Sequence, residues 1–201
     1  MEAIKKLKSE QYKIDRKVVD YSLGLLKPYY EHRREVVKDI PRFWAVVVGE
    51  NEQLQPYITF EDSLAFDALK DVYIQWDPVD SRNFEIAFDF GDNPHFSAQV
   101  LSKRLVWNEL SEEDGFYTSA QATNINWKDS SALPVQHTKG EDKSFFLWFA
   151  YTSTDDLEGR GENTAIAQLL VDEIYPSALE FYEVTQDDQD VAEEYDISDD
   201  E

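Results

Sequence analysis

The sequence predicts an α+β fold, in which a long N-terminal helix precedes a domain built from an antiparallel β-sheet covered by helices. Three observations predict it: an apolar stripe of helical period near the N-terminus, a central stretch of alternating aromatic residues, and short apolar segments with helix-capping residues on both sides of that stretch. The 201 residues suffice for one domain with an appended helix and tail. We therefore expect a long dimerisation helix over residues 1–38, an α/β domain over 39–182 and a disordered acidic tail over 183–201.

The N-terminal helix is predicted from Ile4 to Val37, with a kink near Pro28. Its apolar stripe has spacings of three, four or seven, with Gln11 at the vacant seam position, and comprises Ile4, Leu7, Ile14, Val18, Tyr21 and Leu25. Such a helix spans about 50 Å, whereas a compact domain of the remaining residues is about 40 Å across. Because the helix overhangs its own domain, we expect the stripe to pair with a second copy in a homodimer. The alternative is a helix that folds back on its own domain.

The domain is expected to begin with two short helices. Residues 41–48 form a very apolar segment that starts with proline, which is typical of a buried helix. Thr59, or the acidic pair Glu61 and Asp62, can cap another helix that runs to Leu69.

A change of period then predicts the sheet. Apolar and aromatic residues alternate over 72–76 and 84–90, which indicates a β-hairpin, and a third strand is predicted over 98–107. A weaker fourth strand is expected to end near Ile125 and Trp127, and the rest of the stretch up to the next helix is expected to be loop.

Two helices are predicted after the loops. Ser144 is the expected cap of a helix that runs to Tyr151, and Asn163 is the expected cap of the last helix. The inner face of that last helix is expected to comprise Ile166, Leu169, Leu170 and Ile174.

The composition disfavours metal and covalent chemistry. Cysteine is absent, which excludes disulfides, thiolate metal sites and a cysteine nucleophile. The histidines His32, His95 and His137 lie in unlike contexts, so we expect no metal and no cofactor. An enzymatic interpretation rests on carboxylate pairs such as Glu85 and Asp89, acting as in glycoside hydrolysis. Among 42 acidic residues such pairs arise by coincidence, and we predict that the protein is not an enzyme.

The net charge of −23 is unevenly distributed. Residues 1–48 hold eleven Lys or Arg against seven Asp or Glu, whereas fourteen acidic residues and no basic ones follow Arg160. A field of one sign attracts an oppositely charged partner and disfavours nucleic acid and anionic membranes. No apolar run approaches the roughly 20 residues needed to cross a bilayer. We expect a soluble, intracellular protein whose partner is a basic macromolecule.

Several segments resemble, in their order along the chain, the SET branch of the nucleosome assembly protein family. They are residues 28–34 (PYYEHRR), 40–44 (IPRFW), 84–90 (FEIAFDF), 92–96 (DNPHF), 101–103 (LSK), 125–127 (INW), 144–149 (SFFLWF) and 172–176 (DEIYP). Each segment is weak alone, but the ordered set covers roughly residues 4–182 and is fairly specific.

The resemblance implies a homodimer whose long helices pair antiparallel, each carrying an α/β "earmuff" domain with core histones held against its acidic underside. It implies a histone chaperone that promotes nucleosome assembly or disassembly. The implied location is the nucleus, with or without shuttling to the cytoplasm. In the family, the acidic pair before the Ile-aromatic-Pro motif contributes to histone contact, which here falls on Asp172 and Glu173. Acids of a flexible tail are expected to add to this contact, namely Asp187, Asp188, Asp190, Glu193 and Glu194.

Three alternatives stay open beside this interpretation. In the first, Asp172 and Glu173 form an ordinary solvated helix face that binds no partner. In the second, the acidic tail serves only to keep the protein soluble. In the third, the protein is a non-catalytic adaptor or inhibitor of a chromatin enzyme or of a protein phosphatase, as the resemblance also implies. A histone-modifying enzyme is therefore a further expected partner. Ser198, followed by three acidic residues, resembles an acid-directed kinase site.

Overall fold

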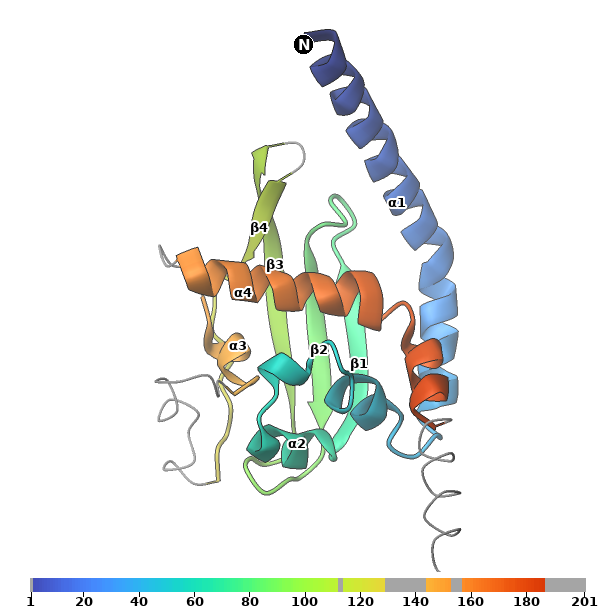
Figure 1. The fold of residues 1–201 in the computed structure, drawn as a ribbon. Helices are drawn as coiled ribbons and strands as arrows, with labels where there is room; N and C mark the ends of the chain where they lie inside the picture. Colours follow the sequence, from blue (N-terminus) through green and yellow to red (C-terminus); the bar gives the residue numbers. More distant parts are fainter. Residues whose placement is uncertain (1, 112–113, 129–143, 153–156, 187–201) are drawn as a thin grey trace, which may run out of the picture.

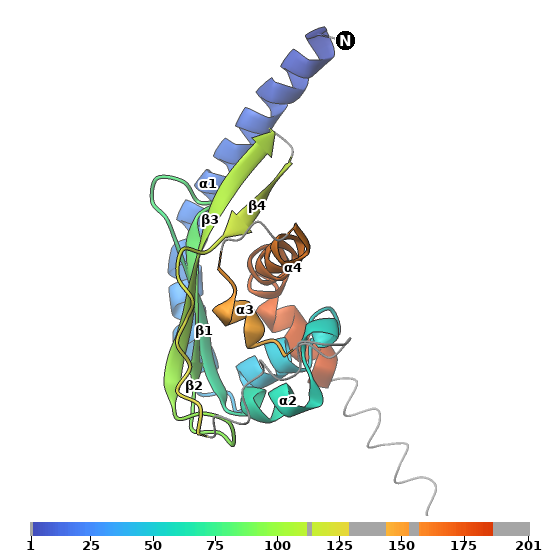
Figure 2. The same cartoon turned by 90° about the vertical axis from the view of Figure 1, so that its left-hand side faces the viewer.

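The computed structural model describes residues 2–111, 114–128, 144–152 and 157–186. A four-stranded antiparallel sheet of strand order β1-β2-β3-β4 forms one layer, and shorter helices cover one of its faces (Figures 1 and 2). The long helix α1 (Glu2–Val37) runs beside the β1 edge and projects beyond the sheet. The fold is therefore the predicted α+β arrangement of a long helix and a covered sheet.

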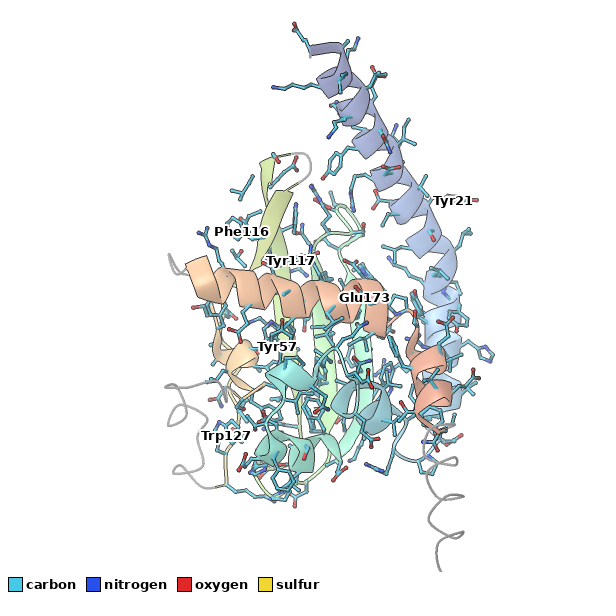
Figure 3. The ribbon with its side chains drawn as sticks, viewed as in Figure 1. Tyr21, Tyr57, Phe116, Tyr117, Trp127 and Glu173 are labelled. Carbon is cyan, nitrogen blue, oxygen red and sulfur yellow. The ribbon has the colours of Figure 1, made fainter. Side chains whose placement is uncertain are left out.

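Helix α1 is continuous even though Pro28 lies inside it. Figure 1 shows its axis bending between the dark-blue N-terminal part and the light-blue C-terminal part, as expected where proline removes a backbone hydrogen bond. The six residues of the predicted apolar stripe are 59% to 71% exposed, and Tyr21 points away from the domain (Figure 3). The alternative in which the stripe folds back on its own domain is therefore wrong.

The opposite face of α1 contacts the domain through polar side chains. The Arg82 guanidinium donates to the Tyr12 hydroxyl at 3.1 Å. Arg16 donates to the Ser81 hydroxyl at 2.9 Å, and that hydroxyl donates to the Asp20 carboxylate at 2.5 Å. Because Tyr12, Arg16 and Asp20 are spaced four residues apart, they share one helix face. This polar face meets the turn between β1 and β2, which leaves the apolar stripe on the outer side.

Short helical segments follow α1. The π-helical turn η1 (Ala45–Gly49) is wholly buried, as predicted for this apolar segment. A 3-10 turn, η2 (Gln55–Tyr57), then leads to α2 (Phe60–Phe66).

Thr59 caps α2 as predicted. Its hydroxyl accepts from the Asp62 N–H at 3.2 Å, while the Asp62 carboxylate accepts from the Thr59 N–H at 3.0 Å. The helix ends before the predicted Leu69, because Leu69 pairs with Phe90 as the first residue of β1.

The sheet consists of β1 (Leu69–Trp76), β2 (Phe84–Phe90), β3 (Gln99–Ser111) and β4 (Asp114–Thr118). The first three confirm the predicted strands, with β3 longer than expected. The register places Phe88 opposite Val72 on one side and Leu101 on the other. All three residues are buried, so the apolar positions of the three strands share the face that the helices cover.

The prediction of a fourth strand near Ile125 and Trp127 is wrong. Trp127 forms an isolated bridge to Phe96, which lies between β2 and β3, whereas β4 pairs with the end of β3. Beyond Trp107, β3 continues into polar residues of an exposed hairpin, so apolar alternation does not mark it. Gly115 of β4 admits the Trp107 ring, which a Cβ atom at that position would overlap.

The chain closes the domain with α3 (Leu147–Ala150), α4 (Leu157–Gln168) and the π-helical turn η5 (Leu169–Ile174). Helix α3 is shorter than predicted, although the Ser144 hydroxyl accepts from the Phe146 N–H at 3.2 Å. Residues 178–186 are helical again, so 183–186, the first residues of the expected tail, lie in a helix.

The prediction that Asn163 caps the last helix is wrong. Helix α4 starts earlier in the chain, and Asn163 lies buried inside it. Its side-chain amide donates to the Tyr117 carbonyl of β4 at 2.9 Å. The inner face of the helix is as predicted, with Ile166, Leu170 and Ile174 buried and Leu169 partly buried.

One lysine is buried in the aromatic core. Lys103 of β3 is 1% exposed, and its ammonium donates to the carbonyls of Trp148 at 2.5 Å and Tyr151 at 2.6 Å. The ammonium also lies 5.2 Å from the centre of the Trp148 ring. Burial lowers the pKa of Lys103 to about 7. Lys103 thus ties β3 to the end of α3 with a group whose charge is costly to keep in this environment.

Candidate functional site

The predicted acidic pair lies on η5, between the buried residues Val171 and Ile174. Asp172 and Glu173 are both exposed, and Figure 3 places Glu173 near the end of this helical segment that approaches α1. Within the part of the chain that the structure describes, neither carboxylate takes part in an ion pair. The pair is therefore available to cations of a partner.

The backbone of η5 directs both carboxylates outward. The Tyr175 N–H donates to the Leu170 carbonyl at 2.9 Å, which is the wide turn of a π-helix. The residues before and after the pair in this turn are buried, so their packing holds Asp172 and Glu173 on the solvent side.

The Asp172 carboxyl interacts electrostatically with Arg16 of α1. Burial raises the pKa of the Asp172 carboxyl, the neighbouring Glu173 raises it further, and Arg16 lowers it. The side chain as a whole is exposed, so the surrounding protein shields only part of its carboxyl from water. Burial also raises the pKa of the Tyr117 hydroxyl, and the charge of Asp172 adds to this shift. Charged or titratable side chains of α1, β4 and η5 therefore interact electrostatically around Asp172.

The arginines in this region are matched by other acids. Arg16 lies 3.4 Å from Asp20 and 3.6 Å from Asp80. Arg82 lies 2.7 Å from Asp80 and 2.8 Å from Glu109. We call the set formed by these residues and the acidic pair the junction surface: Arg16, Asp20, Asp80, Arg82, Glu109, Asp172 and Glu173. Five acids against two arginines leave this surface negative.

Sequence reasoning missed how the junction surface is assembled. The stretch that contains Tyr117 was expected to be loop, without any link to the acidic pair. Tyr12, Arg16 and Asp20 do have a local signal, which is a polar stripe at a spacing of four opposite the apolar one. Their partners on the β1–β2 turn have none, because these contacts join residues far apart in the chain.

The carboxylates of the enzymatic alternative are poorly placed for catalysis. Glu85 and Asp89 are half-buried on the outer face of β2. They are four residues apart, which is about 13 Å along a strand, whereas the paired carboxylates of glycosidases lie about 5 to 9.5 Å apart. Their register partners on β3 are Arg104 and Val100. This arrangement disfavours the glycosidase-like interpretation.

The two histidines of the described residues, His32 and His95, lie on different parts of the fold. His95 lies on a turn, where its Nε2 is 2.8 Å from the Glu61 carbonyl oxygen. His32 is exposed on α1. In the described ranges, no three His, Asp or Glu side chains are grouped so as to hold a metal ion, and no helix there has the length and apolarity to span a membrane. Other predicted residues lie outside the described ranges: His137, Asp187, Asp188, Asp190, Glu193, Glu194 and Ser198.

Comparison with known proteins decides the family. Residues 26–185 match the family model described as nucleosome assembly protein (NAP). The chain belongs to the nucleosome assembly protein family. This matched range includes the C-terminal part of α1, the whole sheet and η5, so it contains both carboxylates of the acidic pair.

One curated relative and several solved structures are similar to this chain over most of its length. Protein SET of Drosophila melanogaster is 31% identical over 169 residues, which are 79% of this chain and 61% of that protein. The crystal structure of Vps75 is 26% identical and has a TM-score of 0.77, covering 92% of this chain and 97% of that one. A crystal structure of a Ccp1 mutant, 22% identical, shares the fold with a TM-score of 0.80, covering 94% and 97%. Another structure describes Vps75 as a histone chaperone.

Proposed function

We propose that this NAP-family protein is a non-enzymatic histone chaperone that binds basic core histones through its acidic surface and promotes nucleosome assembly or disassembly. The observation that carries the proposal is the exposed pair Asp172 and Glu173, which has no ion-pair partner among the described residues and lies on a surface of net negative charge. A nuclear location of the protein, with or without shuttling to the cytoplasm, follows from this function and is part of the proposal.

Electrostatics supports a basic protein as cargo. A net charge of −23 attracts cations over a distance, but the Debye length of about 8 Å at physiological salt restricts strong attraction to acids near the docked partner. The exposed acidic pair satisfies this condition in the folded domain. The tail acids Asp187, Asp188, Asp190, Glu193 and Glu194 are proposed to add contacts once a histone is bound.

We further propose that two copies pair through the apolar stripe of α1. In the single chain, these side chains face water over most of their surface, and burying a Leu or Ile side chain contributes about 1.5–3 kcal/mol. The inner polar face of α1 is already occupied by the β1–β2 turn. A second α1 covers the stripe without disturbing these contacts.

Chaperone activity of this kind requires no bond-making step. The acidic surface neutralises Lys and Arg of the histone, which suppresses its nonspecific binding to DNA, and DNA takes over the histone where it competes better. A histone-modifying enzyme remains a proposed further partner, since a chaperone can present its cargo to such an enzyme.

Titration with the two purified core-histone complexes at several salt concentrations tests the proposal. We expect binding that weakens steeply with salt, and a loss of about tenfold when Asp172→Asn and Glu173→Gln are combined. The matched control combines Glu52→Gln and Glu61→Gln, which neutralises two other exposed acids. Equal losses of affinity in the two variants would show that binding depends on the net charge of the protein and not on this acidic pair. Failure of both complexes to bind at about 0.15 M salt would refute the function.

A further inference from the structure

We propose that Arg33 is a positioning residue, which holds the Asp172–Glu173 pair in its binding position by fastening η5 to α1. This inference rests on the histone-binding function proposed above. Arg33 lies near the C-terminal end of α1 and is 4% exposed, so it does not itself reach a partner.

The Arg33 guanidinium is enclosed by aromatic rings from three parts of the chain. Its central carbon lies 4.4 Å from the ring centre of Tyr175, 4.9 Å from Tyr30, 5.6 Å from Trp44 and 6.0 Å from Tyr29. Aromatic faces attract cations, most strongly away from water. The rings come from α1, the segment just before η1 and the residue just after η5, so one side chain joins these three segments.

Arg33 also binds the backbone directly after η5. Its Nη1 donates to the Tyr175 carbonyl at 2.6 Å and to the Pro176 carbonyl at 3.4 Å. Carbonyls at the end of a helical segment lack partners within the helix and carry partial negative charge. The guanidinium therefore caps the end of the segment that carries the acidic pair.

This arrangement is costly to maintain and specific to arginine. The Nε and Nη2 atoms are buried without a hydrogen-bond partner in the described part of the chain, and burying a cation without a nearby acid is unfavourable. A planar guanidinium can donate to two carbonyls in its plane while its faces stack on rings, which a lysine ammonium cannot do. We infer that the contact fixes a geometry in addition to any stability it provides.

The geometry that Arg33 fixes is the orientation of the acidic pair relative to α1. Asp172 and Glu173 precede Tyr175 in the same wide turn, which the Tyr175 N–H closes at Leu170. If the end of this turn is released, it can relax toward an ordinary α-helical path, which rotates the side chains before it. The carboxylates then leave the junction surface, although their number and charge stay the same.

A double-mutant cycle tests this inference in the full chain. Arg33→Met is expected to weaken histone binding about five- to tenfold in the wild-type background. In the background that carries Asp172→Asn and Glu173→Gln, the same change is expected to weaken binding less than about twofold, because no pair remains to be positioned. A purely structural role predicts equal losses in both backgrounds, and that result would overturn the inference.

Two further variants complete the design. Arg34→Met removes the adjacent arginine, which forms a partly buried ion pair with Asp71 at 2.5 Å. It is expected to change binding less than about twofold, because among the described residues Arg34 makes no ion pair or hydrogen bond with η5. Arg33→Lys keeps the positive charge and is expected to bind histone more tightly than Arg33→Met. It replaces Arg33→Met in the cycle if the methionine variant does not fold. An unaltered affinity of both Arg33 variants would refute the positioning role.

Hydrogen exchange separates this inference from the proposed function. Without histone, Arg33→Met is expected to speed exchange of the amides in 170–177 at least about tenfold, while β2 and β3 keep their protection. If wild-type protein binds no histone but this local change appears, the chaperone function fails and the anchoring by Arg33 stands. Unchanged exchange in 170–177 overturns the anchoring itself.

Discussion

The two parts of α1 meet their surroundings in opposite ways. From Ile4 to Leu25 its apolar stripe faces water, and its contacts with the domain are polar and belong to the β1–β2 turn. Near its C-terminal end, Tyr30, Arg33 and Val37 are buried, and Tyr30 and Arg33 pack against aromatic rings. The same helix therefore stabilises the domain with one part and presents an apolar surface for association with the other.

This difference separates the two tasks energetically. An apolar side chain contributes to folding in proportion to the surface that folding removes from water. The stripe therefore contributes little until a second chain covers it, whereas the buried part contributes to the fold of each single chain. Substitutions in the two regions should accordingly affect different measurements.

The largest expected effect comes from a matched pair of leucines. Leu101→Ala in the core, at 0% exposure, should lower the free energy of unfolding by about 2–5 kcal/mol. Leu25→Ala, at 64% exposure, should change it by less than about 0.5 kcal/mol in the monomeric state. Urea denaturation of both variants measures the difference. Similar losses would remove the distinction between the two regions.

Lys103 gives the core a dependence on pH. Because burial lowers its folded-state pKa to about 7 from 10.5, the unfolded state binds more protons between these values, and stability should rise with pH there. We expect a rise of about 2 kcal/mol in the free energy of unfolding from pH 7 to pH 9. In Lys103→Met this rise should disappear. If the variant keeps the wild-type slope, another group is responsible.

The cap of α2 provides a smaller effect within the domain. Thr59→Ala removes the hydroxyl that accepts from the Asp62 N–H, and should cost about 1 kcal/mol of unfolding free energy. Thr59→Ser keeps the hydroxyl and should cost less. Thermal denaturation ranks the two variants, and the opposite order would remove the capping role.

Charges on the stripe should have the smallest effect on domain stability and a complete effect on assembly. Ile14→Glu combined with Val18→Glu should yield monomers in light scattering. The free energy of unfolding of the domain should change by less than about 0.5 kcal/mol. Lys6→Glu with Lys13→Glu, on an exposed face beside the stripe, is the control and should leave the mass unchanged. A dimer that persists in the first variant would refute pairing through the stripe.

Most regular elements could be predicted from local patterns. The helical period of α1 and the aromatic alternation of β1 and β2 each repeat often enough to identify the element. The end of β3 and β4 could not be predicted, because polar and glycine residues interrupt the apolar alternation there, although Tyr117 of β4 is buried. Asn163 was misassigned as a cap, since the choice between a cap and a buried donor depends on the Tyr117 carbonyl beside it.

The sequence by itself determined the class of fold and the position of the apolar stripe, because these depend on periodicity and composition, and its resemblance to the family made the acidic pair a candidate site. The tertiary structure alone decided that the stripe faces outward, that Arg16 of α1 binds Ser81 of the β1–β2 turn and that Arg33 caps η5. The physical reason is that solvent exposure and electrostatic interactions depend on distances between atoms. Those distances join residues far apart in the chain, and no local pattern encodes them.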